Sequence, residues 1–127
     1  RVMSLDFIET LICVHRMILI SDSMRAVGME DGQYTLGGQD VTVRGALATL
    51  ADGTIAGSAT NLYDCMCKAV EMGIPKEQAI RAATINPAVS IGVGNKVGSL
   101  EAGKYANIVI ADKELHRRQV ILKGVLL

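Results

Sequence analysis

The chain has 127 residues, and its 13 Lys+Arg balance its 13 Asp+Glu. Half of the residues are apolar and only 3% are aromatic, so a core can form, but the cationic, stacking surface that nucleic acid requires is lacking. No apolar run approaches the ~20 residues of a membrane span. Asp6 and Glu9 interrupt the apolar N-terminal stretch, which therefore does not read as a signal peptide. We expect neither nucleic acid nor a membrane as a partner.

The sequence has three cysteines, Cys13, Cys65 and Cys67. An odd number of cysteines is typical of proteins in a reducing compartment. We therefore expect a cytoplasmic protein. Cys65 and Cys67 are two positions apart on a predicted helix, so they point about 200° apart around its axis and cannot bind one metal ion together. Core packing is the role we expect for Cys65.

Residues 17–20 are Met-Ile-Leu-Ile, and Ser21-Asp22-Ser23 follow at once. Four consecutive apolar residues predict a strand buried on both faces, as in a parallel sheet. Such a strand brings Asp22 to its C-terminal end, where α/β folds gather ligands and catalytic groups. From these residues alone, a turn-forming role for Asp22 has the stronger support.

No turn signal separates His15 from Arg16, although a strand over 10–14 would lead straight into the one at 17–20. Parallel neighbours need a crossover of about a dozen residues. Either the two segments form one long strand or residues are missing between them.

Turn signals alternate with short apolar segments over much of the remaining chain. Residues 26–34 predict a polar loop, and residues 35–50 a β-hairpin or small meander with turns at Gly37-Gly38 and Gly45. A short apolar step follows at 55–58. Near the end of the sequence, two more strands are expected at 106–111 and 119–125, the second interrupted by a glycine.

Two helices are predicted between these strands. The first covers 61–72, with Asn61 as N-cap and an apolar stripe on one face. The second begins at Pro75 and should break at Asn86-Pro87, after which a short piece can resume over 87–91. The few strands cannot close a sheet by themselves, so the pattern predicts the end of a longer α/β protein.

Four stretches carry a resemblance to the amidohydrolase superfamily. They are ILISDSMRAVGMEDGQYTLGG at 18–38, DGTIAGS at 52–58, AIRAATINPA at 79–88 and VGSLEAGKYANIVIAD at 97–112. The last two recur across many amidohydrolases. The first two are closer to the deacetylases of N-acetylglucosamine 6-phosphate, and all four occur in that family's order. From about Arg16 to its end, the chain resembles the C-terminal third of such an enzyme.

The resemblance implies an α/β fold: the C-terminal part of a (β/α)₈ TIM-type barrel, followed by strands of a small β-sandwich domain. The partial barrel would occupy residues 1–96, with 17–21 as its last strand. Residues 97–127 would supply sandwich strands.

By the same resemblance, Asp22 is the catalytic general base. It would take a proton from a metal-bound water that attacks the acetamide carbonyl, and then pass a proton to the leaving amine. Ile55, Ala56 and Gly57 would bind substrate through their backbone, since small residues allow close approach, although an ordinary turn is an equal alternative. His15 would match a substrate-binding histidine of the family, or else is structural.

The resemblance further implies a divalent metal ion, zinc or similar, held by a glutamate and two histidines on earlier barrel strands. None of these ligands lies in this sequence, and His15 and His116 are too distant in sequence to form a convincing site. We therefore assign no metal ligand to this chain.

The implied activity is hydrolysis of N-acetylglucosamine 6-phosphate to glucosamine 6-phosphate and acetate, in amino-sugar catabolism, by a homo-oligomer such as a dimer. Two alternatives stay open. One is another amidohydrolase, such as a deaminase or cyclic-amide hydrolase, against which the DGQYTLGG segment at 31–38 speaks. The other is a non-catalytic packing or dimerisation module. The 127 residues alone are expected to be inactive, and oligomeric or unstable, because a helix stripe would lack its sheet.

Overall fold

The computed structural model describes residues 16–45 and 47–127. Backbone contacts divide the chain into two compact units. We call residues 20–65 the hairpin unit, and residues 66–127 together with 16–19 the C-terminal unit. His15 lies outside the described residues, and the domain boundary predicted between 96 and 97 stays a prediction.

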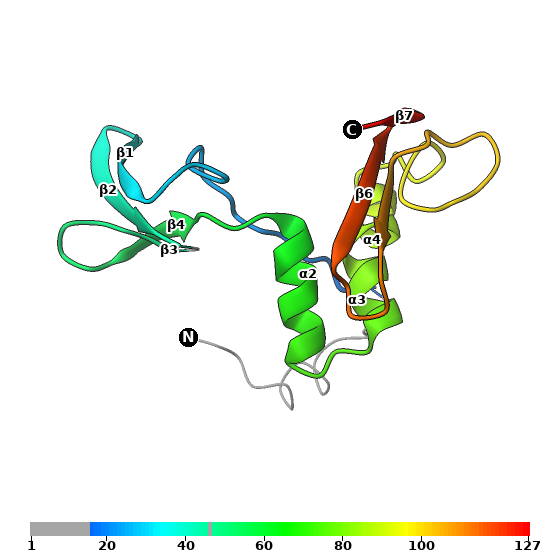
Figure 1. The fold of residues 1–127 in the computed structure, drawn as a ribbon, viewed down its shortest axis with the longest axis horizontal. Helices are drawn as coiled ribbons and strands as arrows, with labels where there is room; N and C mark the ends of the chain where they lie inside the picture. Colours follow the sequence, from blue (N-terminus) through cyan, green and yellow to red (C-terminus); the bar gives the residue numbers. More distant parts are fainter. Residues whose placement is uncertain (1–15, 46) are drawn as a thin grey trace. The chain divides into compact units, whose positions relative to one another are not determined.

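The hairpin unit is built on a four-stranded antiparallel sheet in which neighbours along the chain pair with one another (Figure 1). Its strands are β1 (Gly32–Leu36), β2 (Gln39–Arg44), β3 (Leu47–Thr49) and β4 (Ile55–Ser58). The two-residue turn between β1 and β2 is Gly37-Gly38, with φ of 59° and 84°. Two positive φ values define the turn type whose twist suits a hairpin. The hairpin or meander predicted over 35–50 is therefore confirmed, except that its first strand begins at Gly32 and not at residue 35, and β4 extends it.

Alternation along β2 creates the core of the hairpin unit. Val41 and Val43 are each only 1% exposed, because successive side chains of a strand point to opposite faces. They form a cluster with Ala48 of β3 and with Met24 and Ala26. The segment that follows Asp22 is thus anchored in this core.

Helix α2 (Leu62–Glu71) confirms the first predicted helix. Asn61 caps it as expected: its Oδ1 accepts a hydrogen bond from the Asp64 amide at 3.0 Å, and its Nδ2 donates to the Asp64 carboxylate at 2.7 Å. The first of these bonds satisfies a backbone donor that the first helical turn leaves unpaired. No helix among the described residues has both the length and the apolar character needed to cross a membrane.

The second predicted helix is divided into α3 (Lys76–Ala83) and α4 (Ile85–Ser90). The break lies at Thr84 and not at Asn86-Pro87, so the predicted position was wrong by two residues. Pro87 falls in the first turn of α4, where a missing backbone N–H costs no helical hydrogen bond. The Thr84 hydroxyl donates instead to the Ile80 carbonyl at 2.7 Å.

A second, three-stranded antiparallel sheet ends the C-terminal unit. Its strands are β5 (Ile108–Ala111), β6 (Arg117–Leu122) and β7 (Val125–Leu126). The strand predicted at 119–125 is really two, because Lys123 and Gly124 adopt φ of 50° and 83° and reverse the chain. Positive φ at two successive residues again makes a tight hairpin turn.

The strand predicted at residues 17–20 is wrong in this structure, since none is assigned there. The Leu19 amide donates to the Ala82 carbonyl at 2.9 Å, and Asn86 Nδ2 donates to the Met17 carbonyl at 2.8 Å. The segment therefore bonds to the α3 and α4 region and not to a neighbouring strand. Ile20 is 76% exposed, in contrast to a residue buried on both faces of a sheet.

Candidate functional site

Asp22 occupies a left-handed backbone conformation in the hairpin unit. Its φ is 48°, a region that few residues other than glycine adopt and that aspartate and asparagine tolerate best. The Ser58 amide donates to the Asp22 carbonyl at 3.3 Å, and the Met24 amide donates to the Ser58 carbonyl at 2.9 Å. These bonds form a parallel bridge between Ser23 and Ser58. The exposed Asp22 side chain is thus carried on a backbone that is held at the Asp22 carbonyl and at the Met24 amide.

The same bridge brings Asp22 beside β4, which contains the predicted substrate-binding residues. Gly57 lies closest: a Cβ added there would sit 4.0 Å from the Asp22 carbonyl oxygen and 3.8 Å from Met24 Sδ. Ala56 packs on the core cluster, whereas Ile55 is 67% exposed. The proximity of Asp22 to Ile55, Ala56 and Gly57 is a feature of the structure, while their roles stay predictions. His15, the other predicted substrate ligand, lies outside the described residues.

Two serines flank Asp22, and the sequence reasoning gave them no role. Ser23 Oγ lies 2.6 Å from the Thr60 carbonyl oxygen and 2.6 Å from Ser21 Oγ. A carbonyl can only accept, and a hydroxyl has one proton to donate. The Ser23 proton therefore goes to Thr60, and Ser21 donates to Ser23. The Ser-Asp-Ser pattern was visible in the sequence, but the contact with Thr60 spans 37 positions and was not.

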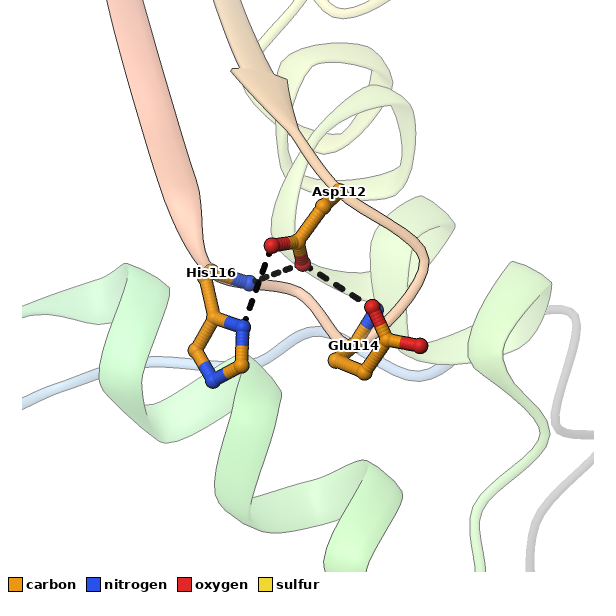
Figure 2. Close-up of side chains that lie close together, drawn as sticks. All are labelled: Asp112, Glu114 and His116. Carbon is orange, nitrogen blue, oxygen red and sulfur yellow. Dashed lines mark hydrogen bonds and ion pairs between the residues drawn. The ribbon is translucent and has the colours of Figure 1, made fainter.

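A cluster with potential metal ligands lies in the C-terminal unit, at the turn between β5 and β6. Ligand atoms of Asp112, Glu114 and His116 lie within 4.8 Å of one another. Figure 2 shows these side chains gathered around the Asp112 carboxylate, which accepts hydrogen bonds from the Glu114 amide at 3.1 Å and the His116 amide at 2.8 Å. The other carboxylate oxygen lies 3.1 Å from His116 Nδ1 and 2.5 Å from the Arg118 guanidinium.

These contacts set the charge of the Asp112 carboxyl. Desolvation raises its pKa, but the His116 amide, the His116 ring and the Arg118 guanidinium together outweigh it and hold the pKa below its ordinary value. The carboxylate is therefore ionised and already neutralised by neighbouring donors.

The Asp112 cluster does not fit a catalytic divalent ion. Such an ion needs carboxylate oxygens and imidazole nitrogens that are free to bind it. Here Arg118 already places a positive charge on one Asp112 oxygen, and two backbone amides occupy the other. Across residues 16–45 and 47–127, no second group of three or more potential ligands comes this close. We assign the cluster to the turn itself.

The sequence of the chain matches the amidohydrolase family model over residues 9–127. The match covers all of the hairpin unit and of the C-terminal unit, including Asp22 and β4. The chain therefore belongs to the amidohydrolase family.

Particular relatives narrow the comparison to deacetylases of hexosamine phosphates. The chain is 39% identical over 112 residues to a putative N-acetylgalactosamine-6-phosphate deacetylase of Escherichia coli (strain K12), covering 87% of the chain and 67% of the relative. It is 39% identical over 113 residues to the N-acetylglucosamine-6-phosphate deacetylase of Vibrio furnissii, covering 88% of the chain and 28% of the relative.

A solved structure supports the same family. It is an aspartate-to-alanine variant of N-acetyl-D-glucosamine-6-phosphate deacetylase from Mycobacterium smegmatis, in complex with N-acetyl-D-glucosamine-6-phosphate. It aligns with a TM-score of 0.82 and 34% identity, over 94% of this chain and 32% of that chain. The chain thus spans less than a third of these longer proteins. The mixed helix-and-strand fold of the described residues is one that this deacetylase shares.

Proposed function

We propose that this chain is part of an enzyme that hydrolyses N-acetylglucosamine 6-phosphate to glucosamine 6-phosphate and acetate. The observation that carries the proposal is the placement of Asp22 directly beside β4, within a chain of the amidohydrolase family. Similarity to the Vibrio furnissii and Mycobacterium smegmatis deacetylases supports the substrate. The barrel-and-sandwich origin of the fold, a cytoplasmic location and a homo-oligomeric state belong to the same proposal.

Asp22 supplies the proton transfers of this reaction. Its carboxylate takes one proton from the attacking water, whose oxygen forms a bond with the acetamide carbonyl carbon. The C–N bond then breaks, and Asp22 returns the proton to the departing amine nitrogen, which leaves acetate and the free amino sugar. A positioned carboxylate of this kind contributes about 10²–10⁴-fold in rate.

The backbone of β4 lies beside the backbone of Asp22. Ala56 and Gly57 are small residues, which allow a sugar ring to approach the main chain closely. We therefore assign Ile55, Ala56 and Gly57 to substrate binding, mainly through peptide groups.

The family implies a divalent metal ion, and the Asp112 cluster does not fit one. We therefore assign no metal ligand to the described residues and derive no step through the ion. The ligands belong to the part of the longer relatives that this chain does not match.

A second candidate substrate is N-acetylgalactosamine 6-phosphate. The Escherichia coli and Vibrio furnissii relatives are equally similar to the chain, at 39% identity each, and their names differ in the sugar. The two sugars differ only at one ring hydroxyl, so the same proton transfers serve both. A comparison of kcat/KM for the two phosphates decides between them.

The test is acetate release by the full-length natural protein, supplied with a divalent metal ion, with and without Asp22→Asn. Asparagine tolerates positive φ as aspartate does, so the fold should survive while the base is lost. We expect kcat to fall about 10²–10⁴-fold. Asp40→Asn, which removes another exposed carboxylate of the hairpin unit, is the matched control and should retain the wild-type rate. An Asp22→Asn enzyme with unchanged kcat would remove Asp22 from the mechanism.

A further inference from the structure

We propose that Ser23 is a positioning residue that holds Asp22 in its left-handed conformation by fastening the Asp22 segment to the entry of helix α2. The inference rests on the proposed function of Asp22. It assigns a specific task to a hydroxyl that lies next to the general base in sequence.

The contact that carries the inference joins two distant segments of the hairpin unit. Ser23 Oγ lies 2.6 Å from the carbonyl oxygen of Thr60, and the two residues are 37 positions apart. Thr60 directly precedes Asn61, which caps α2 through two hydrogen bonds with Asp64. The Thr60 amide also donates a hydrogen bond to Ser58 Oγ at 3.1 Å. The acceptor of the Ser23 hydroxyl is therefore itself held in place.

Asp22 needs such support because its backbone conformation is unfavourable. A positive φ is less favourable than the ordinary regions even for aspartate, and such a conformation persists only where its surroundings hold it. The core holds Met24, which is 8% exposed, and two backbone bonds with Ser58 hold the bridge. Ser23, which directly follows Asp22, adds a side-chain hydrogen bond to the Thr60 carbonyl.

The hydrogen bonds of Ser23 leave its hydroxyl no proton to donate to a substrate, so we assign it to holding Asp22 and not to binding substrate. Its single proton is donated to the Thr60 carbonyl, while its oxygen accepts from Ser21. An alanine at 23 would leave the Thr60 carbonyl and the Ser21 hydroxyl without this partner. Asp22 could then relax toward ordinary φ, which would move its carboxylate.

The experiment compares Ser23→Ala, Ser23→Thr and Ser90→Ala in the full-length, metal-supplied protein. Ser90 is an exposed serine at the end of α4, so its substitution is the matched control. We expect Ser23→Ala to lower kcat about 10–100-fold, since a displacement of about 1 Å can cost 10²-fold, while KM changes less than about threefold. Threonine keeps the hydroxyl and should restore most of kcat. Ser90→Ala should behave as wild type.

Combination with Asp22→Asn separates positioning from a general loss of structure. If Ser23 acts only through the Asp22 carboxylate, Ser23→Ala should lower the residual rate of the Asp22→Asn enzyme no further. Independent, multiplying losses in the double variant would overturn the proposal. An unchanged kcat in Ser23→Ala would overturn it as well, even if the melting temperature falls.

Amide hydrogen exchange keeps the test independent of the proposed function. If the wild-type protein deacetylates neither hexosamine phosphate, the proposed function fails. The effect of the hydrogen bond between Ser23 and Thr60 on the backbone can still be measured. Faster exchange of the Met24 and Ser58 amides in Ser23→Ala, reversed in Ser23→Thr, would support it. Equal exchange in all three proteins would show that Ser23 holds nothing.

Discussion

Two segments of the molecule have similar sequences, but only one of them forms a β-strand. Residues 18–22 read Ile-Leu-Ile-Ser-Asp in the first segment, and residues 108–112 read Ile-Val-Ile-Ala-Asp in the second. Residues 108–111 form β5, paired with β6, whereas no strand forms over 17–20. The apolar pattern is common to both, so the available backbone partners decide which of them becomes a strand.

The aspartates that end these segments differ in the same way. Asp112 has its carboxylate engaged by two backbone amides, a histidine ring and a guanidinium. Asp22 is held through its backbone carbonyl, on a left-handed φ, with its side chain exposed. A carboxylate surrounded by donors from its own turn stabilises that turn. A carboxylate carried on a constrained backbone beside a strand edge is available for chemistry.

Alanine substitutions of glycine can compare how closely the two units are packed around the substituted backbone. In the C-terminal unit, a Cβ at Gly98 would lie 2.9 Å from both Ala88 Cβ and Ile85 Cα. Gly103→Ala is the matched control, because Gly103 also has positive φ but open space around it.

We expect both variants to lose about 1–2 kcal/mol from the positive φ, and Gly98→Ala to lose about 1–3 kcal/mol more from overpacking. Urea unfolding measures both. Equal losses in the two variants would mean that the close packing around Gly98 contributes nothing to stability.

Gly57→Ala is the counterpart in the hairpin unit and should show the opposite behaviour. The added Cβ would meet Met24 and Asp22 at 3.8–4.0 Å, which is ordinary van der Waals contact. Stability should therefore stay within about 1 kcal/mol of wild type, but the methyl group would lie against the backbone of Asp22 beside the strand to which we assign the sugar. We expect KM to rise about tenfold with kcat little changed. A Gly57→Ala enzyme with wild-type KM would separate β4 from substrate binding.

Local pattern was enough to predict the elements whose partners are close in sequence. The turn at Gly37-Gly38 and the Asn61 cap both follow from residues within a few positions of one another. Helix α2 was bounded to within a residue at each end for the same reason.

Elements with distant partners were predicted less well. The segment 17–20 bonds to residues more than 60 positions away, and an apolar run cannot reveal whether its partner will be a strand or a helix end. Around the candidate site, the sequence indicated Asp22 and residues 55–57 separately. Their bridge, and the tie from Ser23 to Thr60, depend on chain folding across 35 or more positions.

The smallest effect we expect concerns the Asp112 turn and its dependence on pH. The folded-state pKa of Asp112 lies below its ordinary value of 3.8, because the donors around the carboxylate outweigh its desolvation. A carboxyl with a depressed pKa adds stability above that ordinary value and loses it as pH falls through the lower, folded-state pKa. Asp112→Asn should therefore be less stable than wild type at about pH 6, and the gap should narrow at about pH 3.

Urea midpoints at both pH values measure the difference in stability between Asp112→Asn and wild type. The two proteins should deacetylate substrate at the same rate. Added salt should also narrow the gap at about pH 6, because the contact with Arg118 is exposed enough to be screened. A gap that is equal at both pH values would mean that the turn is held by hydrogen-bond geometry and not by charge. A fall in deacetylation rate would be the more serious result, since it would give the Asp112 cluster a part in the chemistry that we assign to Asp22.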